Sequence, residues 1–187
     1  MNPRTARLQA SRRLGSVRLD PARRVSIRQI DAFDRPALAA FYAGLSPESV
    51  RRRFLGRREL TDADIDAMVA DDGLVAVLSA RGPDDGQIVG HAQLSAVDAD
   101  TVEAAFAVRD DLQGRGIGRA LVDAAIGHAR RRGWRRLTAD TFVDNVAMRR
   151  LLRGAGCRVE RDLLDGGVEE IVLRLVSDAA TAAAPAR

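Results

Sequence analysis

The stretch Gln113-Gly114-Arg115-Gly116-Ile117-Gly118-Arg119 separates an alternating apolar segment, Thr101–Val108, from a segment with helical spacing over 116–132. The first pattern predicts a strand and the second predicts an amphipathic helix, so the glycines form a strand-turn-helix junction. Glycine lets backbone N–H groups converge on a ligand, and the helix behind adds unpaired N–H donors and partial positive charge. The stretch therefore predicts a pyrophosphate site, to which Arg115 and Arg119 add charge.

Other phosphate-binding turns match these residues less well. The GxxxxGK[ST] pattern of a P-loop is absent from the chain. The dinucleotide fingerprint Gly-x-Gly-x-x-Gly fails as well, because Arg119 occupies the position of its third glycine. A glycine turn that serves only the fold and binds no ligand remains an alternative.

Outward from this junction, the hydrophobic pattern predicts a mixed α/β domain. Short helices come early: one runs through Leu38, one covers Val50–Leu55, and a third runs through Met68. We expect strands over 24–30, Gly73–Ala80, Ile88–Val97, Thr101–Val108, Arg136–Phe142, Val159–Leu163 and Val168–Leu175, and a helix over Asn145–Arg153. The order β-α-α-β-β-β-α-β-α-β-β, with the extra short helix, gives one central mixed sheet of about six to seven strands flanked by helices. Because a helix joins them, Arg136–Phe142 should lie parallel to the strand before it.

The chain of 187 residues is long enough for one domain with a sizeable core. We expect that domain over 24–176, between a flexible basic segment over 1–23 and a disordered, alanine-rich tail over 177–187. The basic segment overlaps organelle transit peptides in composition but lacks the apolar stretch of a secretory signal. No apolar run reaches the roughly 20 residues that span a bilayer, so we expect a cytoplasmic protein with no membrane partner.

All 30 basic residues are arginine, and the formal net charge is +4. A basic balance fits nucleic acid, a membrane surface or an anionic cofactor. One tyrosine and five phenylalanines besides Trp134 offer few platforms for base stacking, so we favour the cofactor and expect no nucleic-acid partner. With Cys157 as the single cysteine and only two histidines, we expect no internal disulfide and no metal site.

The glycine turn resembles the cofactor motif Gln/Arg-x-x-Gly-x-Gly/Ala of the Gcn5-related N-acetyltransferase (GNAT) superfamily, matched at Gln113, Gly116 and Gly118. The resemblance runs from about Val25 to Leu175 and implies the GNAT fold, with acetyl-CoA as the cofactor. It also implies cofactor contacts from the strand end, the turn and a later helix. The residues concerned are Phe106, Ala107, Val108, Gln113, Gly114, Arg115, Gly116, Ile117, Gly118, Arg119, Asn145 and Met148.

A second motif begins at Asn145, where the family has an asparagine that contacts the pantetheine arm or the substrate. A helix N-cap is the other reading of Asn145. Many family members carry a tyrosine on this helix that protonates the departing thiolate, and Leu152 stands at that position here. The family's aromatic residue after the last glycine is replaced by Cys157, which we expect to be a small buried apolar side chain and not a nucleophile.

Glu103 is the expected general base. Strand alternation places Glu103 on one side of Thr101–Val108 with two alanines, and the larger apolar residues on the other. If the carboxylate is partly buried, its pKa rises toward neutrality, which suits proton abstraction from an amine. An edge glutamate exposed to solvent is the alternative. We expect His91, on the neighbouring strand, only to line the site.

The stretch Leu45–Gly56 resembles the substrate-side helices of bacterial protein-lysine acetyltransferases. This resemblance implies an enzyme that moves an acetyl group to a primary amine by direct attack, with a protein lysine as candidate acceptor. A small amine such as an aminoglycoside, or a non-catalytic module that binds or senses acyl-CoA, remains an alternative. We expect a monomer or homodimer. We also expect the arginines at 51–53 to form a solvated helix face.

Overall fold

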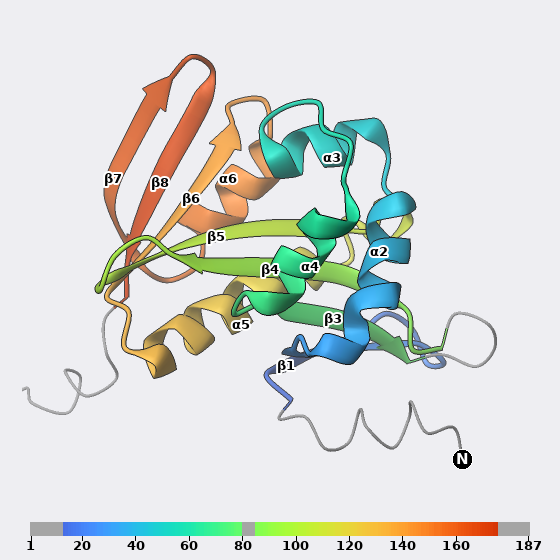
Figure 1. Cartoon of the computed structure of the whole chain (residues 1–187). Helices are drawn as coiled ribbons and strands as arrows, with labels where there is room; N and C mark the ends of the chain where they lie inside the picture. The colour runs from blue at the N-terminus through green and yellow to red at the C-terminus, as the bar shows by residue number, and fades with distance from the viewer. Residues whose placement is uncertain (1–12, 80–84, 176–187) are drawn as a thin grey trace, which may run out of the picture.

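A single mixed sheet of eight strands forms the centre of the molecule, in the order β1-β2-β3-β4-β5-β6-β8-β7 (Figure 1). The computed structural model describes residues 13–79 and 85–175. Neighbouring strands are antiparallel throughout, except that β5 and β6 are parallel and are joined through helix α5. The mixed α/β class and the parallel crossover predicted from the sequence are therefore confirmed.

The structure contains the helices and strands predicted from the sequence, and several of their first and last residues differ slightly from the prediction. The strands are β1 (Gly15–Arg18), β2 (Arg24–Gln29), β3 (Leu74–Ser79), β4 (Ile88–Ala96), β5 (Thr101–Val108), β6 (Arg136–Phe142), β7 (Arg158–Asp165) and β8 (Val168–Arg174). The helices are η1 (Ala32–Asp34), α2 (Arg35–Ala43), α3 (Pro47–Phe54), α4 (Asp62–Ala70), η2 (Asp110–Leu112), α5 (Ile117–Arg132) and α6 (Val146–Arg153). Ala80, the predicted end of one strand, lies outside the described residues.

Strand β1 corrects the prediction of a flexible segment over 1–23. It pairs antiparallel with β2, and the N–H of Leu14 donates to the carbonyl oxygen of Ile27 at 2.8 Å. Leu14 and Val17 also pack against the core, so this segment gains enough apolar contact to be ordered. The sheet consequently has eight strands instead of six to seven. Residues 1–12 and the predicted tail over 177–187 lie outside the described residues.

Helices cover both faces of the sheet, as the alternation along β3 shows (Figure 1). Leu74, Ala76 and Leu78 belong to a cluster of buried residues built with α5. Val75 and Val77 belong to a second cluster built with α2 and α4, to which α3 adds partly buried residues. Successive strand residues point to opposite faces, so the two clusters lie on opposite sides of the sheet.

The sheet opens between β5 and β6. Strand β5 pairs with β4 at seven positions from Val102 to Val108, but it pairs with β6 only at Thr101, Val102 and Glu103. Beyond Glu103 the two parallel strands diverge. Helix α5 packs tightly beneath the neighbouring strand, because a Cβ added at Gly90 would lie 2.9 Å from Cδ1 of Leu121. The close packing holds β4 and β5 in place and leaves the opening on the β6 side.

Candidate active site

A cavity of about 370 Å³ lies where β5 and β6 diverge. Its walls come from α3, β5, the glycine turn with the start of α5, β6, and α6 with the N-cap before it. The lining residues are Ser49, Arg52, Arg53, Ala104, Ala105, Phe106, Ala107, Val108, Gln113, Gly114, Gly116, Gly118, Arg119, Ala139, Asp140, Thr141, Asn145, Ala147, Met148 and Leu151. The structure thus brings together ten of the twelve predicted cofactor residues. The other two do not line the cavity: Ile117 is buried in the core and Arg115 is exposed.

The glycine turn has the backbone that an anion site requires. Gly114 and Gly116 have φ angles of 72° and 86°, in the left-handed region that favours glycine. Gly116 also caps α5 without a side-chain hydrogen bond, and the first helical donor is the N–H of Ala120, which bonds to the oxygen of Gly116 at 3.1 Å. The N–H groups of the first helical turn are therefore free of helical partners and lie beside the cavity, a combination that fits a phosphate group.

Hydrogen bonds tie helix α3 to this turn. Asp110 accepts the N–H of Ser46 at 2.9 Å and the hydroxyls of Ser46 and Ser49 at 2.8 and 2.7 Å. The Gln113 amide donates to the carbonyl oxygen of Val108 at 3.1 Å and to the Ser49 hydroxyl at 3.2 Å. The start of α3, the end of β5 and the glycine turn therefore form one connected wall of the cavity.

Helix α6 places Asn145 and Met148 on the opposite wall. The Asn145 carbonyl Oδ1 caps the helix by accepting the N–H of Met148 at 3.3 Å, so Asn145 both begins the helix and lines the cavity. Leu152 is 0 % exposed and packs in the core, which leaves no proton donor at the position of the family's tyrosine. Cys157 packs against the same core, and burial raises the pKa of its thiol, as expected for an apolar role.

The carboxylates near the cavity are arranged differently from the prediction. Glu103 is exposed and does not line the cavity, so the condition of partial burial is not met and the alternative of an exposed glutamate describes its position. Asp140, which the sequence analysis missed, is the one acidic residue among the described residues that line the cavity. Because Glu103 pairs in register with Thr138, alternation along β6 puts Asp140 on the same face as Glu103. The sequence alternation along β6 shows that Asp140 and Thr138 share a face, but it does not show that this face reaches the cavity.

Comparison with known proteins agrees with this geometry. The acetyltransferase (GNAT) family model matches residues 38–157. The chain belongs to this family. It is 32 % identical over 149 residues to an acetyltransferase from Pseudomonas aeruginosa, covering 77 % of this chain and 80 % of that one. It is 37 % identical over 120 residues to the acetyltransferase Pat of Mycolicibacterium smegmatis, covering 59 % of this chain but 34 % of Pat.

Solved structures of acetyltransferases resemble this fold. The GNAT domain of S. lividans PAT superposes with a TM-score of 0.71 at 28 % identity, covering 81 % of this chain and 91 % of that one. The Salmonella typhimurium yncA structure, a putative acetyltransferase with its cofactor acetyl-CoA, has a TM-score of 0.64 at 23 % identity, covering 87 % and 98 %. The protein is therefore an acetyltransferase that uses acetyl-CoA, and the free N–H groups of the glycine turn fit the phosphates of that cosubstrate.

In the acetyltransferase, polar side chains cross the face of β4 next to the cavity. Arg53 extends from α3 to the amide oxygen of Gln93, while the Gln93 amide and the Ser95 hydroxyl both donate to Asp71. Arg53 lines the cavity, so the expectation of a fully solvated arginine face is wrong for this residue. His91, on the same face, is 0 % exposed, and its Nδ1 lies 2.9 Å from the Tyr42 hydroxyl.

Burial of His91 predicts a pH-dependent stability. Burial, with a smaller effect of Arg53, lowers the pKa of His91 to about 3 from 6.5. Between these values the unfolded chain binds a proton that the folded chain does not, so stability falls as the pH drops below about 6.5. We expect His91 to account for a loss of about 1.4 kcal/mol in unfolding free energy per pH unit. Urea unfolding of the wild type and of His91→Gln at several pH values measures this contribution. If the unfolding free energies of the two proteins changed equally with pH, the contribution of His91 would be refuted.

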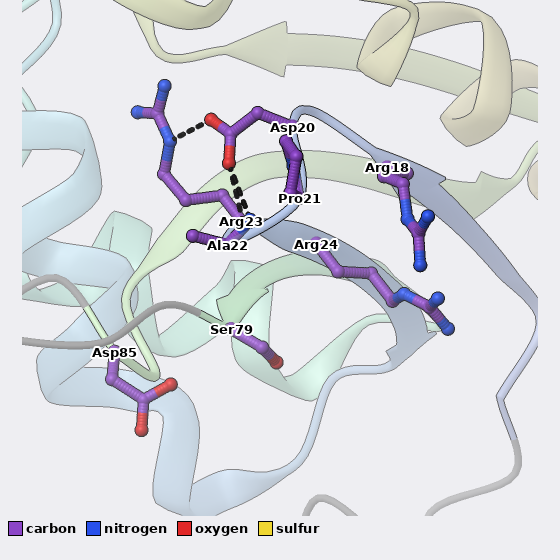
Figure 2. Close-up of a pocket in the computed structure, with 8 residues that line it drawn as sticks. All are labelled: Arg18, Asp20, Pro21, Ala22, Arg23, Arg24, Ser79 and Asp85. Atoms are coloured by element: carbon purple, nitrogen blue, oxygen red, sulfur yellow. Dashed lines mark hydrogen bonds and ion pairs between the residues drawn. The ribbon is translucent and has the colours of Figure 1, made fainter.

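A second hollow, of about 330 Å³, lies on the β1–β2 hairpin (Figure 2). Asp20 fills the hairpin turn: its carboxylate accepts the N–H groups of Ala22 and Arg23 at 2.9 Å and binds Nε of Arg23 at 2.6 Å. The hollow shares no lining residue with the cavity between β5 and β6.

Among the helices in the described ranges, none has the length and apolar character that crossing a membrane requires.

Proposed function

We propose that the protein transfers the acetyl group of acetyl-CoA to a primary amine, with a protein lysine as the acceptor. The observation that carries the proposal is the cavity between β5 and β6, whose wall has free N–H donors at the start of α5 and a carboxylate, Asp140, on β6. The resemblance of Leu45–Gly56 to the substrate-side helices of protein-lysine acetyltransferases supports a lysine acceptor.

The cavity walls suggest which residues hold the cosubstrate. The turn from Gln113 to Arg119 binds the pyrophosphate through its backbone N–H groups, with Arg119 at the edge. The backbone of Phe106–Val108, on the side of β5 that β6 leaves unpaired, forms hydrogen bonds with the amides of the pantetheine arm. Asn145 and Met148 contact the same arm from α6. Arg115 is exposed and contributes only charge near the phosphates.

Acetyl-CoA supplies an activated acetyl thioester, and the protein supplies position and proton transfer. The amine nitrogen forms a bond to the acetyl carbon while the carbon–sulfur bond breaks and the sulfur leaves with its electron pair. Glu103 accepts the proton that the amine loses, directly or through water, and passes it to solvent. The thiolate takes a proton from water, because Leu152 is buried and has no proton to donate.

Two measurements on one preparation test this function. Calorimetry gives the affinity for acetyl-CoA, and a free-thiol assay gives turnover with lysine peptides, an aminoglycoside and a polyamine. We expect binding, together with thiol release above hydrolysis that is fastest with lysine peptides. Thiol release with the small amines but not with the lysine peptides would show that the acceptor is a small amine and not a protein lysine. Binding without release from any amine would favour a module that senses acyl-CoA.

A further inference from the structure

Asp140 is the one acidic residue among the described residues that line the cavity. It lies on β6, on the face that also carries Glu103 of β5, and it lines the cavity between these diverging strands. The glycine turn and the start of α5, which fit the phosphates, belong to another part of the cavity wall. Asp140 therefore shares a face of the sheet with the expected base, Glu103, which itself lies outside the cavity lining.

No arginine among the described residues forms an ion pair with Asp140, although Arg52 and Arg53 line the same cavity. In this arginine-rich chain many acidic residues are paired, as Glu169 is with Arg149 and Arg153, and Asp34 is with Arg28. No hydrogen bond or ion pair joins the side chain of Asp140 to another described residue. A carboxylate without an ion pair on a cavity wall is available to a cation that enters from outside.

The neighbours of Asp140 strengthen the negative potential at this point. Glu170, directly opposite on β8, and Glu103, on β5, are the charged groups that act on it from the two adjacent strands, and Glu170 is itself bound to Arg161. Although the residue as a whole is exposed, partial desolvation of its carboxylate, followed by the charges of Glu103 and Glu170, raises the pKa of Asp140. Three carboxylates on neighbouring strands repel one another, and a bound ammonium group relieves that repulsion.

We propose that Asp140 is the residue that binds the ammonium group of the acceptor and so selects cationic amines. This proposal rests on the proposed function and deepens it by naming a residue for acceptor recognition. Asp140 holds the ammonium nitrogen beside Glu103 by a charge-assisted hydrogen bond, and Glu103 remains the group that removes the proton. Asp140 thus acts mainly on acceptor affinity, whereas Glu103 acts on the chemical step.

The variant Asp140→Asn separates these roles. Because Asp140 is exposed and unpaired among the described residues, the change should leave folding and the Kd for acetyl-CoA unaltered. We expect KM for the best amine acceptor of the wild type to rise on the order of tenfold, which corresponds to the loss of one partly solvated ion pair, while kcat changes little. Binding of that acceptor to the complex with CoA, followed by fluorescence anisotropy, should weaken by the same factor.

Two further variants complete the test. Asp165→Asn makes the same change in charge at the β7–β8 turn, outside the cavity, and should behave as the wild type. Asp140→Glu should recover part of the affinity. An unchanged KM in Asp140→Asn, or a loss of kcat alone, would overturn the proposal for Asp140 while leaving acetyl transfer intact. A wild-type protein that releases no thiol with any amine would instead overturn the proposed function.

Discussion

Gly118→Asp is expected to weaken acetyl-CoA binding, measured by calorimetry, on the order of a hundredfold or more. Gly118 lies in the first turn of α5 and lines the cavity, where a Cβ would already lie 3.2 Å from Cδ1 of Leu151. The new carboxylate would stand where the pyrophosphate is proposed to bind, and it would compete for the same N–H groups. Charge repulsion and lost hydrogen bonds, each worth about 1–3 kcal/mol, together weaken binding on the order of a hundredfold or more.

The same helix offers a matched control. Gly127 lies nine residues further along α5 and does not line the cavity; a Cβ there would lie 3.4 Å from a nitrogen of Arg131. Gly127→Asp therefore adds the same charge to the same helix, next to an arginine, and should retain wild-type affinity for acetyl-CoA. Equal loss of binding in both variants would mean that the helix itself is perturbed. Retained binding in Gly118→Asp would refute the assignment of the glycine turn.

Glu103→Gln is expected to lower kcat on the order of a hundredfold or more, with little change in the Kd for acetyl-CoA. The amide keeps the size of the side chain but cannot accept the proton that the amine loses, and general-base catalysis typically contributes about 10²–10⁴ in rate. The effect should shrink at high pH, because a larger fraction of the acceptor then arrives already neutral. Steady-state kinetics with the best amine acceptor, from about pH 7 to pH 10, measures both effects.

Glu59→Gln serves as the control for this change, because Glu59 is exposed and lies outside the cavity between β5 and β6. Turnover in Glu103→Gln that matched this control would remove Glu103 from the mechanism.

Much of the fold could be read from the sequence because local signals and tertiary packing agree. Thr101–Val108 and Arg136–Phe142 alternate over seven or eight residues and were placed with their final bounds. Strand β1 was missed because it has only four residues and is held by contacts with β2 and the core, although Asp20-Pro21 directly after it is a turn signal. Long-range pairing of this kind leaves little trace in local sequence.

The site was less predictable than the fold. The glycine turn carries its own backbone requirement, so its residues were found directly. Asp140 and Arg53 reach the cavity only because β5 and β6 diverge and α3 is anchored above them, and neither feature has a local signal. The sequence left open whether Glu103 is buried, because alternation gives the face of a residue but does not show where along the strand that face is covered.

The divergence of β5 and β6 leaves the acetyltransferase with an exposed edge inside its own sheet. Bare strand edges are templates on which other chains add strands, and they are a common origin of aggregation. A pantetheine arm hydrogen-bonded along β5 would act as the missing strand and cover that edge. The cosubstrate should therefore also protect the folded protein against self-association. At a concentration 100 times its Kd, a ligand that binds only the folded state adds about 2.7 kcal/mol to the stability, so purification and storage with CoA should raise both Tm and solubility.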